Sequence, residues 1–354
     1  MSYTDYLMFE VESGSLNFTG FSSYCSNSAF TCDFFHTLLL IINTLIVIFG
    51  VIGNGTVLFL SKNYKALRTD KISLVLLESL AAADILCALT LYFPTLITLI
   101  ANKWVFGRLL CGVFGYSFAL PFCAEIMLIM TLTFHRLYVL KRPLRAGGLR
   151  ARTGHIIVTS IWCLSGLVLV SRVVKYDVMF VPAIFTCDTK DSKYSDDQGS
   201  VAELGILCVP MIAIVLGNIW MLVIVAKSQG KVGHRSMPGR QAVVTTSMIG
   251  GCFFISLGVT LIAQMLDIGY KGKEWRPGWT GTLQIYSISL NFVINPFIYY
   301  LRNPGFRNTV QRILIRTHFN SRFSSLMSRG GSGVIRNNDS GAGRRESERN
   351  EAWV

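Results

Sequence analysis

Seven long apolar segments, separated by short polar connections, constrain this chain more than any other feature of its sequence. Each is longer than the roughly 20 residues that an α-helix needs to cross the hydrocarbon core of a bilayer. The chain is 51% hydrophobic and only 15% charged, whereas a soluble fold carries about 25% charged residues. We therefore expect an all-α membrane protein built as a seven-transmembrane helix bundle. The expected spans are 37–60, 73–101, 109–140, 154–174, 202–226, 241–266 and 279–301.

The positions of lysine and arginine predict how the bundle is oriented. Of 33 such residues, none lies in residues 1–36, while four, six and four flank the first, third and fifth connections and ten follow Leu301. Because these residues accumulate on the cytoplasmic side of membrane proteins, we expect an extracellular N-terminus and a cytoplasmic C-terminus. Topology and attraction to anionic membrane lipid explain the net charge of +13, so no nucleic-acid partner is expected. Docking of an acidic protein partner is an additional interpretation of the same surface.

The third span is the longest of the seven and carries an isolated carboxylate, Glu125, near its middle. At roughly 1.5 Å per residue it covers about 45 Å, a full bilayer with its headgroups. The spacing of Phe118, Phe122, Glu125 and Arg136 places them on one helical face. We interpret this span as the central column of the bundle, with a site in its outer half and a basic effector surface at its inner end.

Segments on either side of the bundle complete the domain organisation. We expect an extracellular tail over 1–36, the bundle over 37–301, a short amphipathic eighth helix on the membrane surface over 302–316, and a disordered cytoplasmic tail over 317–354. Asn17 lies in an Asn-Phe-Thr sequon and is a candidate glycosylation site. Cys25 and Cys32 are a candidate disulfide pair in the outer tail.

Polar residues near the middle of the spans need an explanation, because such groups are costly in a bilayer core. They are Asn54, Asp84, Glu125, Asn291 and Asn295. One interpretation is a hydrogen-bond cluster that only holds helices together. Two adjacent carboxyl groups, however, cannot both stay charged unless a cation lies between them. We therefore expect Asp84 and Glu125, with Asn291 and Asn295, to form a sodium or proton site.

The sequence lacks the motifs of a structural metal site and of the common enzyme active sites. The nine cysteines include no CxxC pair, so no structural metal site is expected. The sequence has no phosphate loop, HExxH or GxSxG motif, and we therefore do not expect an enzyme.

Short motifs follow one another along the chain in a specific order. They are GNGTV at 53–57, LAAAD at 80–84, WVFG at 104–107, FHRLYVLKRP at 134–143, Trp162, Pro210, NPFIYY at 295–300 and Phe306. Each motif alone is weak. Their combined order and spacing over residues 37–316 resemble the class A (rhodopsin-like) G-protein-coupled receptors.

The resemblance implies roles for individual residues. Cys111 matches the family's disulfide cysteine, and a bond to Cys187 would tie the long outer loop over the mouth of the bundle. Asp84 matches the family's sodium-binding aspartate, so the one cofactor expected is an allosteric sodium ion. Arg136 matches the arginine of the D/E-R-Y motif. The residues expected in activation and G-protein coupling are His135, Arg136, Asn295, Pro296 and Tyr299.

Departures from the family pattern bear on activation. His135 replaces the acid that normally precedes the arginine and helps to hold the inactive state, and Glu78 is the one substitute that the sequence offers. We therefore expect raised basal signalling. In the sixth span, Gly258 stands where the family has a tryptophan and Thr260 where it has a proline, while Asn218 in the fifth span replaces a tyrosine. These losses favour the opposite outcome, a receptor that signals poorly or acts as a decoy.

Two positions narrow the class of ligand that the resemblance implies. Phe118 stands where amine receptors carry an aspartate, and the last span has no retinal-linking lysine. The ligand classes that remain are a peptide, a lipid or another non-amine small molecule. The pocket candidates by helical pitch are Phe118, Phe122, Met265, Ile285 and Ser289.

The function implied is that of a plasma-membrane receptor that passes ligand binding to a heterotrimeric G protein, with arrestin as a further partner of the C-terminal tail. The rival interpretation is a proton- or cation-coupled transporter that uses Asp84 and Glu125. The odd number of spans and the absence of inverted repeats argue against it.

Overall fold

The computed structural model describes residues 29–64, 70–181, 184–191, 197–229, 240–269 and 279–316. Three predictions fall outside these residues or their described side chains: the sequon at Asn17, the pairing of Cys25 with Cys32, and the tail over 317–354.

The chain divides into two units, residues 1–309 and 310–354. The helix bundle belongs to the first unit. The predicted eighth helix is present over 304–316 and crosses the boundary between the units. It begins where Asn303 accepts a hydrogen bond from the backbone N–H of Phe306 over 3.1 Å, as an N-cap residue does.

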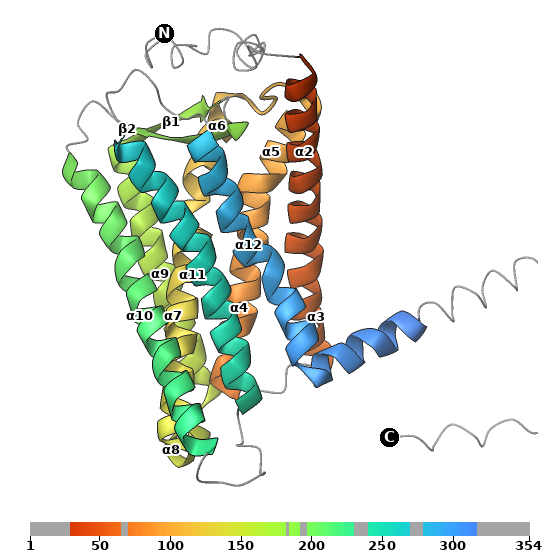
Figure 1. Cartoon of the computed structure of the whole chain (residues 1–354), viewed down its shortest axis with the longest axis vertical. Coiled ribbons are helices and arrows are strands. Elements are labelled where there is room, and N and C mark those ends of the chain that lie inside the picture. The colour runs from red at the N-terminus through yellow and green to blue at the C-terminus, as the bar shows by residue number, and fades with distance from the viewer. Residues whose placement is uncertain are drawn as a thin grey trace, which may run out of the picture. The chain divides into compact units, whose positions relative to one another are not determined.

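Seven helical columns correspond one to one to the predicted spans (Figure 1). Three columns contain more than one segment: α2 (Ala29–Ile48), η2 (Phe49–Gly53) and α3 (Asn54–Tyr64); α4 (Lys71–Cys87), η3 (Ala88–Tyr92) and α5 (Phe93–Ala101); and α6 (Gly107–Ser117) with α7 (Ala119–Lys141). The other four are α9 (Ala151–Lys175), α10 (Asp197–Gln229), α11 (Arg240–Gly269) and α12 (Trp279–Arg302). A short helix, α8 (Pro143–Gly147), connects α7 to α9.

Six of these columns are long and apolar enough to cross a membrane, judged over the described residues. The seventh, α12, has a lower mean hydropathy because it contains Gln284, Asn291 and Asn295. It packs against α2, α3, α4 and α11, and both asparagines are buried. Polar side chains placed in this way are sheltered from lipid. The prediction of a seven-helix membrane bundle is confirmed.

The third column occupies the centre of the bundle, because α7 packs against α4, α9, α10 and α11. Its hydrogen-bond pattern is interrupted between α6, which ends at Ser117, and α7, which begins at Ala119, although Phe118 keeps helical backbone angles. Pro121 explains this break. It has no N–H to donate to the carbonyl oxygen of Ser117, four residues earlier.

Two π-helical turns, η2 and η3, face each other in the first two columns. A Cβ added to Gly50 in η2 would lie 3.0 Å from the Cβ of Ala88 in η3, and one added to Gly53 would lie 3.0 Å from the Cγ of Pro296 in α12. Both glycines therefore permit a close approach of helices. Pro94 follows η3 and cannot donate to a carbonyl within it, which interrupts the α-helical pattern.

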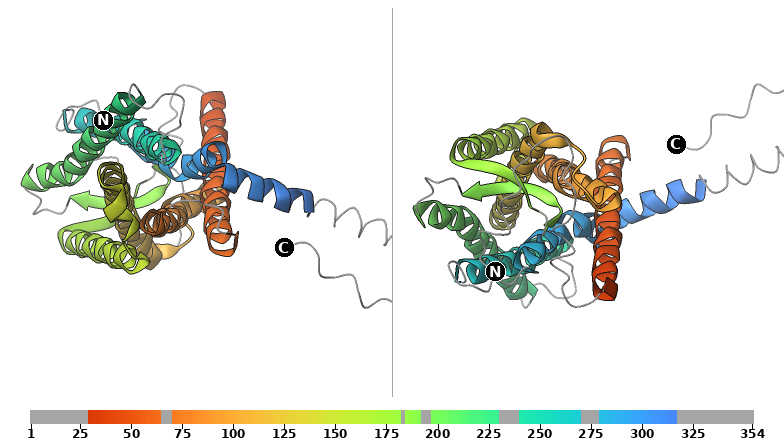
Figure 2. Two further views of the ribbon diagram at one scale, coloured as in Figure 1. Left: turned by 90° about the horizontal axis from the view of Figure 1, so that it is seen from below. Right: turned by 90° about the horizontal axis from the view of Figure 1, so that it is seen from above.

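A hairpin closes one end of the bundle, which we call the outer end; the opposite end is the inner end. Strands β1 (Tyr176–Val181) and β2 (Thr186–Asp191) are antiparallel and lie across the helix ends (Figure 2). A disulfide joins Cys111 of α6 to Cys187 of β2, with 5.4 Å between their Cα atoms, and Trp104 packs against both cysteines. The predicted disulfide is confirmed.

Candidate functional site

The inner end of α7 carries an ion-pair cluster formed by Asp70, His135 and Arg136. The Arg136 guanidinium donates from Nη1 to Oδ2 of Asp70 over 2.8 Å. The Nε2 atom of His135 lies 2.7 Å from Oδ1 of the same carboxylate. Arg136 is only 7% exposed. A carboxylate that precedes α4 therefore engages two adjacent residues of α7.

Asp70 is also held by its own helix. Its side chain accepts a hydrogen bond from the backbone N–H of Ser73 over 2.9 Å, which makes it the N-cap of α4. Burial raises the pKa of Asp70, but hydrogen bonds from His135 and Ser73 and the charge of Arg136 outweigh it and hold this pKa well below its usual range. Asp70 is therefore an ionised and rigidly placed carboxylate at neutral pH.

This cluster corrects the expectation that Arg136 lacks a strong acidic partner. Glu78, the substitute that the sequence offered, accepts a hydrogen bond from the hydroxyl of Ser61 in α3 over 2.8 Å instead. Asp70 was missed because it lies 66 residues before Arg136 and belongs to no motif. The signal that could have found it is an acid at a helix N-cap among the basic inner connections.

The other residues expected in activation lie on α12. Pro296 has no N–H for the carbonyl oxygen of Phe292, and Nδ2 of Asn54 in α3 donates to that oxygen over 2.7 Å. Tyr299 is buried near Arg136, and within the described part of the chain its hydroxyl has no hydrogen-bond partner. The structure thus links the GN motif of the first span to the NP motif of the last.

The expected sodium or proton site lies in the interior of the bundle. Nδ2 of Asn295 donates to Oδ2 of Asp84 over 2.8 Å, and Asp84 and Glu125 are fully buried. Three carboxyl oxygens (Oδ1 of Asp84 and both of Glu125) and the amide of Asn291 have no hydrogen-bond partner among the described residues. Oxygen-rich groups of this kind fit a hard cation, and a carboxyl pair also fits a proton. The described residues contain no cluster of three His, Cys, Asp or Glu.

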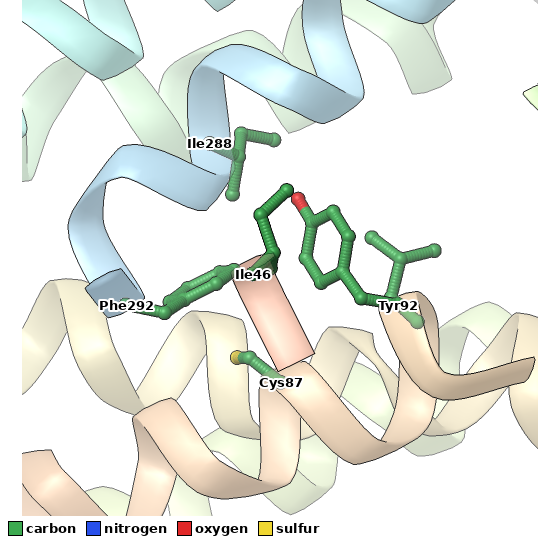
Figure 3. Packing of buried hydrophobic residues seen from close by; sticks show 6 residues of the cluster. Ile46, Cys87, Tyr92, Ile288 and Phe292 are labelled. Atoms are coloured by element: carbon green, nitrogen blue, oxygen red, sulfur yellow. The ribbon is translucent and has the colours of Figure 1, made fainter. Parts of the chain in front are cut away.

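An apolar cluster in the outer half of the bundle draws residues from α2, α4, η3 and α12. Figure 3 shows how its labelled side chains lie near one another: Ile46, Cys87, Tyr92, Ile288 and Phe292. Three of the predicted pocket residues, Phe118, Phe122 and Ile285, pack against this cluster. The rings of Phe118 and Phe122 are stacked with 5.4 Å between their centroids. The structure therefore brings these three candidates together.

The remaining two pocket candidates lie differently. Ser289 is buried, and its hydroxyl donates to the carbonyl oxygen of Tyr286 over 2.6 Å. Met265 is 57% exposed. By helical spacing it shares a face of α11 with the exposed Ile255 and Ile262. Met265 therefore faces away from the interior, which contradicts its placement among the pocket residues.

Neighbouring residues of α11 are buried to different extents. Phe253 and Leu257 are buried, whereas Phe254 is 44% exposed. A Cβ added to Gly258 would meet nothing within 4 Å. Leu257, and not Gly258, therefore fills the interior at the level where the family pattern has an aromatic side chain.

Buried hydroxyl groups join α11 to α12, and we call Ser256, Thr260 and Ser287 the hydroxyl cluster. Ser256 donates to the carbonyl oxygen of Ser287 over 2.5 Å, and the hydroxyl oxygens of Thr260 and Ser287 are 2.8 Å apart. Thr260 is also within 3.1 Å of the Ser256 carbonyl. The residue that replaces the family's proline therefore binds a neighbouring helix and leaves α11 without a proline kink.

Two residues in the connection between β1 and β2, Ile184 and Phe185, pack into the bundle, and we call them the loop plug. Both are buried, and Phe185 packs with Leu39 of α2 and Leu99 of α5. A Cβ on Gly281 of α12 would lie 3.3 Å from Ile184. Phe185 has a φ of 54°, which is uncommon for a bulky side chain and is maintained by this packing.

The fold and the site together are those of a seven-transmembrane receptor. It has seven membrane helices, a disulfide-bound hairpin at one end and a buried arginine at the other. The family described as "7 transmembrane receptor (rhodopsin family)" matches residues 53–299. This chain belongs to the rhodopsin family of seven-transmembrane receptors. It is accordingly a multi-pass membrane receptor and not an enzyme.

Two similar receptors and one solved structure share about a fifth of their residues with this chain at 21–22% identity. A GQ-coupled rhodopsin of Mizuhopecten yessoensis is 21% identical over 78% of this chain, and the match spans only 60% of that protein. The C3a anaphylatoxin chemotactic receptor of Oncorhynchus mykiss is 22% identical over 81% of this chain and 79% of that protein. The crystal structure of squid rhodopsin superposes with a TM-score of 0.61 at 21% identity, over 79% of this chain and 80% of that one. This structural likeness shows the fold alone.

Proposed function

We propose that this protein is a plasma-membrane receptor that transmits the binding of an extracellular ligand to a heterotrimeric G protein. The observation that supports the proposal is the buried Arg136 guanidinium at the inner end of the central helix, held by an acid from a neighbouring helix. An ion pair of this kind allows a closed and an open packing. A ligand shifts their populations if it binds one of them more tightly. In the open packing, Arg136 and Tyr299 are presented to the G protein.

The basic residues support a cytoplasmic inner end. They are concentrated in the connections that lie at this end and in the C-terminal segment. In this orientation Asn17 is extracellular and open to glycosylation, and the helix over 304–316 lies on the inner leaflet as an amphipathic helix. The tail beyond residue 316 is then available to arrestin.

The apolar cluster supports a ligand that presents an apolar surface. A lipid, another non-amine small molecule or the apolar side chain of a peptide fits the surroundings of Phe118, Phe122 and Ile285. Ser289 is a buried hydroxyl on the same helix as Ile285. Raised basal signalling is not part of the proposal, because Asp70 supplies the acid that position 135 lacks.

The test of the receptor proposal is a ligand-library screen read out by G-protein dissociation in cells that express the full chain. We expect at least one ligand class to evoke dissociation in wild type and in the control Arg108→Ala, which removes an exposed arginine at the outer end. Arg136→Ala should lose the response at equal surface expression. No response to any ligand, or an unchanged response in Arg136→Ala, would overturn the proposal.

We further propose that Asp84 and Glu125 hold a sodium ion or share a proton, on the support of their unpartnered buried oxygens. A bound ion stabilises the folded receptor by mass action. Sodium should therefore raise the melting temperature of wild type relative to choline, and Glu125→Gln should abolish this rise. A shared proton predicts a dependence on pH instead, without one on sodium. If the melting temperature depends on neither sodium nor pH and is unchanged in Glu125→Gln, both the sodium site and the shared proton are excluded.

A further inference from the structure

We propose that Asp70 is the positioning residue that restrains Arg136 in the closed packing, and that the restraining acid has passed from α7 to α4, a change that we call the exchange. The acid that the family pattern puts before the arginine stands at the N-cap of α4, and His135 occupies its former position on α7. This inference rests on the proposed function, because it assigns a restraint to the arginine that contacts the G protein.

The geometry of Asp70 suits a restraint. Both carboxylate oxygens are engaged by α7, one by Arg136 at 2.8 Å and the other by His135 at 2.7 Å. The backbone N–H of Ser73 fixes the same side chain from α4. Charge-assisted hydrogen bonds are stronger than neutral ones, and a fixed carboxylate loses little freedom in forming them. Asp70 therefore acts as a rigid bridge between two helices.

The exchange changes what must move when Arg136 is released. An acid next to the arginine on α7 would travel with it, so the pair could persist through a movement of that helix. Asp70 belongs to α4, a different helix from the one that carries Arg136. The ion pair between Asp70 and Arg136 therefore breaks when α7 moves away from the start of α4. Its presence or absence depends on the distance between these two helices.

His135 completes the exchange. With an acid at position 135 as well, two carboxylates would compete for one guanidinium, and like charges at this distance are unfavourable. A histidine can instead donate to the carboxylate that it faces. Arg136 needs one acid as its partner, and this acid can stand either at position 70 on α4 or at position 135 on α7. It follows that the acid can be moved back.

The experiment compares wild type with Asp70→Asn, His135→Asp and the double variant that carries both. Asparagine caps a helix as well as aspartate does, so Asp70→Asn removes the charge and keeps the cap. Glu78→Gln is the matched control, because it removes one charge from the inner half of the same helix. Two quantities are measured on the full chain: ligand-free G-protein activation at equal surface expression, and hydrogen exchange of the inner end of α7 in lipid nanodiscs.

We expect Asp70→Asn to raise ligand-free activation by roughly fivefold or more, the lower end of typical coupling between sites. Exchange at the inner end of α7 should be faster in this variant. The double variant should return both quantities towards wild type, and Glu78→Gln should leave both unchanged. If Asp70→Asn matches Glu78→Gln in both measurements, or if the double variant behaves like Asp70→Asn alone, the inference is wrong.

The two proposals fail in different ways. If no variant activates a G protein and no ligand does so in wild type, the proposed function is wrong. Hydrogen exchange then still decides whether Asp70 restrains α7: faster exchange in Asp70→Asn supports the restraint, and unchanged exchange overturns it. If Asp70→Asn does not reach the cell surface, Asp70→Ser takes its place, because serine also caps helices and carries no charge.

Discussion

At the scale of single residues, Pro296 and Asn54 show how a helix-breaking residue is accommodated inside a membrane. Proline leaves the carbonyl oxygen of Phe292 without its helical donor, and no water is available in the bilayer core to replace that donor. The side-chain amide of Asn54 supplies it from α3 over 2.7 Å. Gly53, the preceding residue, permits the approach because a Cβ there would lie 3.0 Å from Pro296.

We predict that Asn54→Ala destabilises the receptor by about 1–2 kcal/mol, because the carbonyl oxygen of Phe292 is left buried and unpaired. Thermal unfolding of the purified protein measures the effect. The control is Asn63→Ala, since Asn63 donates to the carbonyl of Phe59 in its own helix at an exposed position. Equal melting temperatures for the two variants would contradict the prediction.

The acid limb of the stability profile tests the ion pair of Asp70. The folded-state pKa of Asp70 is lowered, so its contribution to stability is complete above its unfolded value of about 3.9 and is lost as the pH falls through the folded value. We expect wild type to exceed Asp70→Asn in melting temperature at neutral pH. This difference should shrink below about pH 4. A difference that stays constant down to pH 3 would contradict it.

Some of these residues could be identified as functional candidates from the sequence, and one could not. Asn54, Asp84 and Pro296 lie inside apolar spans, where a polar or helix-breaking residue is conspicuous. Asp70 lies in a polar connection, where an acid is ordinary, and its importance depends on a contact across 66 residues. Spacing along one helix cannot reveal a partner on another.

At the scale of elements, the hydroxyl cluster replaces a proline kink as the link between α11 and α12. Ser256 donates across to α12 over 2.5 Å, and Thr260 meets the hydroxyl of Ser287 at 2.8 Å. All three residues are buried. Hydrogen bonds between membrane helices hold the two helices in register. We therefore expect α11 and α12 to move together.

Loss of this link should be measurable. We predict that Ser256→Ala lowers stability by about 1 kcal/mol, because the bond to the carbonyl of Ser287 is lost. Ser160→Ala is the control, since Ser160 is exposed and bonds only to Ile156 in its own helix. Differential scanning fluorimetry compares the two variants. The cluster contributes nothing if they unfold at the same temperature.

Met265 of α11 was predicted to line the pocket, and the structure places it on an exposed face of the helix instead. The alignment that puts Gly258 at the position of the family's tryptophan does not say which face of α11 points inward. In the structure Phe253 and Leu257, one helical turn apart, are buried. A shift of one residue rotates a helix by about 100°. An apolar face directed at lipid is as hydrophobic as one directed inward, so hydrophobicity cannot decide between them.

At the scale of the whole molecule, the hairpin and the loop plug join elements that the sequence separates widely. The disulfide connects residues 76 positions apart, and the plug contacts α2, α5 and α12. The seven spans and this covalent link were predictable from hydropathy and motif order. The plug was not, because its two apolar residues lie in a loop whose path no periodicity describes.

We predict that replacing both Cys111 and Cys187 with serine lowers the stability of the fold by about 4 kcal/mol, the expectation for a crosslink that closes a loop of this length. The melting temperature of the purified receptor is the measured quantity. Cys163→Ser serves as the control, because Cys163 is exposed and outside any disulfide. A double variant as stable as this control would show that packing of the hairpin suffices without the bond.

The two π-helical turns have a consequence for how such a receptor diversifies. Each turn holds about one extra residue, which corresponds to about 100° of helical rotation. Deleting one residue from η2 or η3 would rotate the outer half of its column and leave Asn54 and Asp84 in place on the inner side. A single-residue insertion or deletion in either turn would thus change the side chains presented in the outer half, while the inner half, where the proposed signalling contacts lie, keeps its packing.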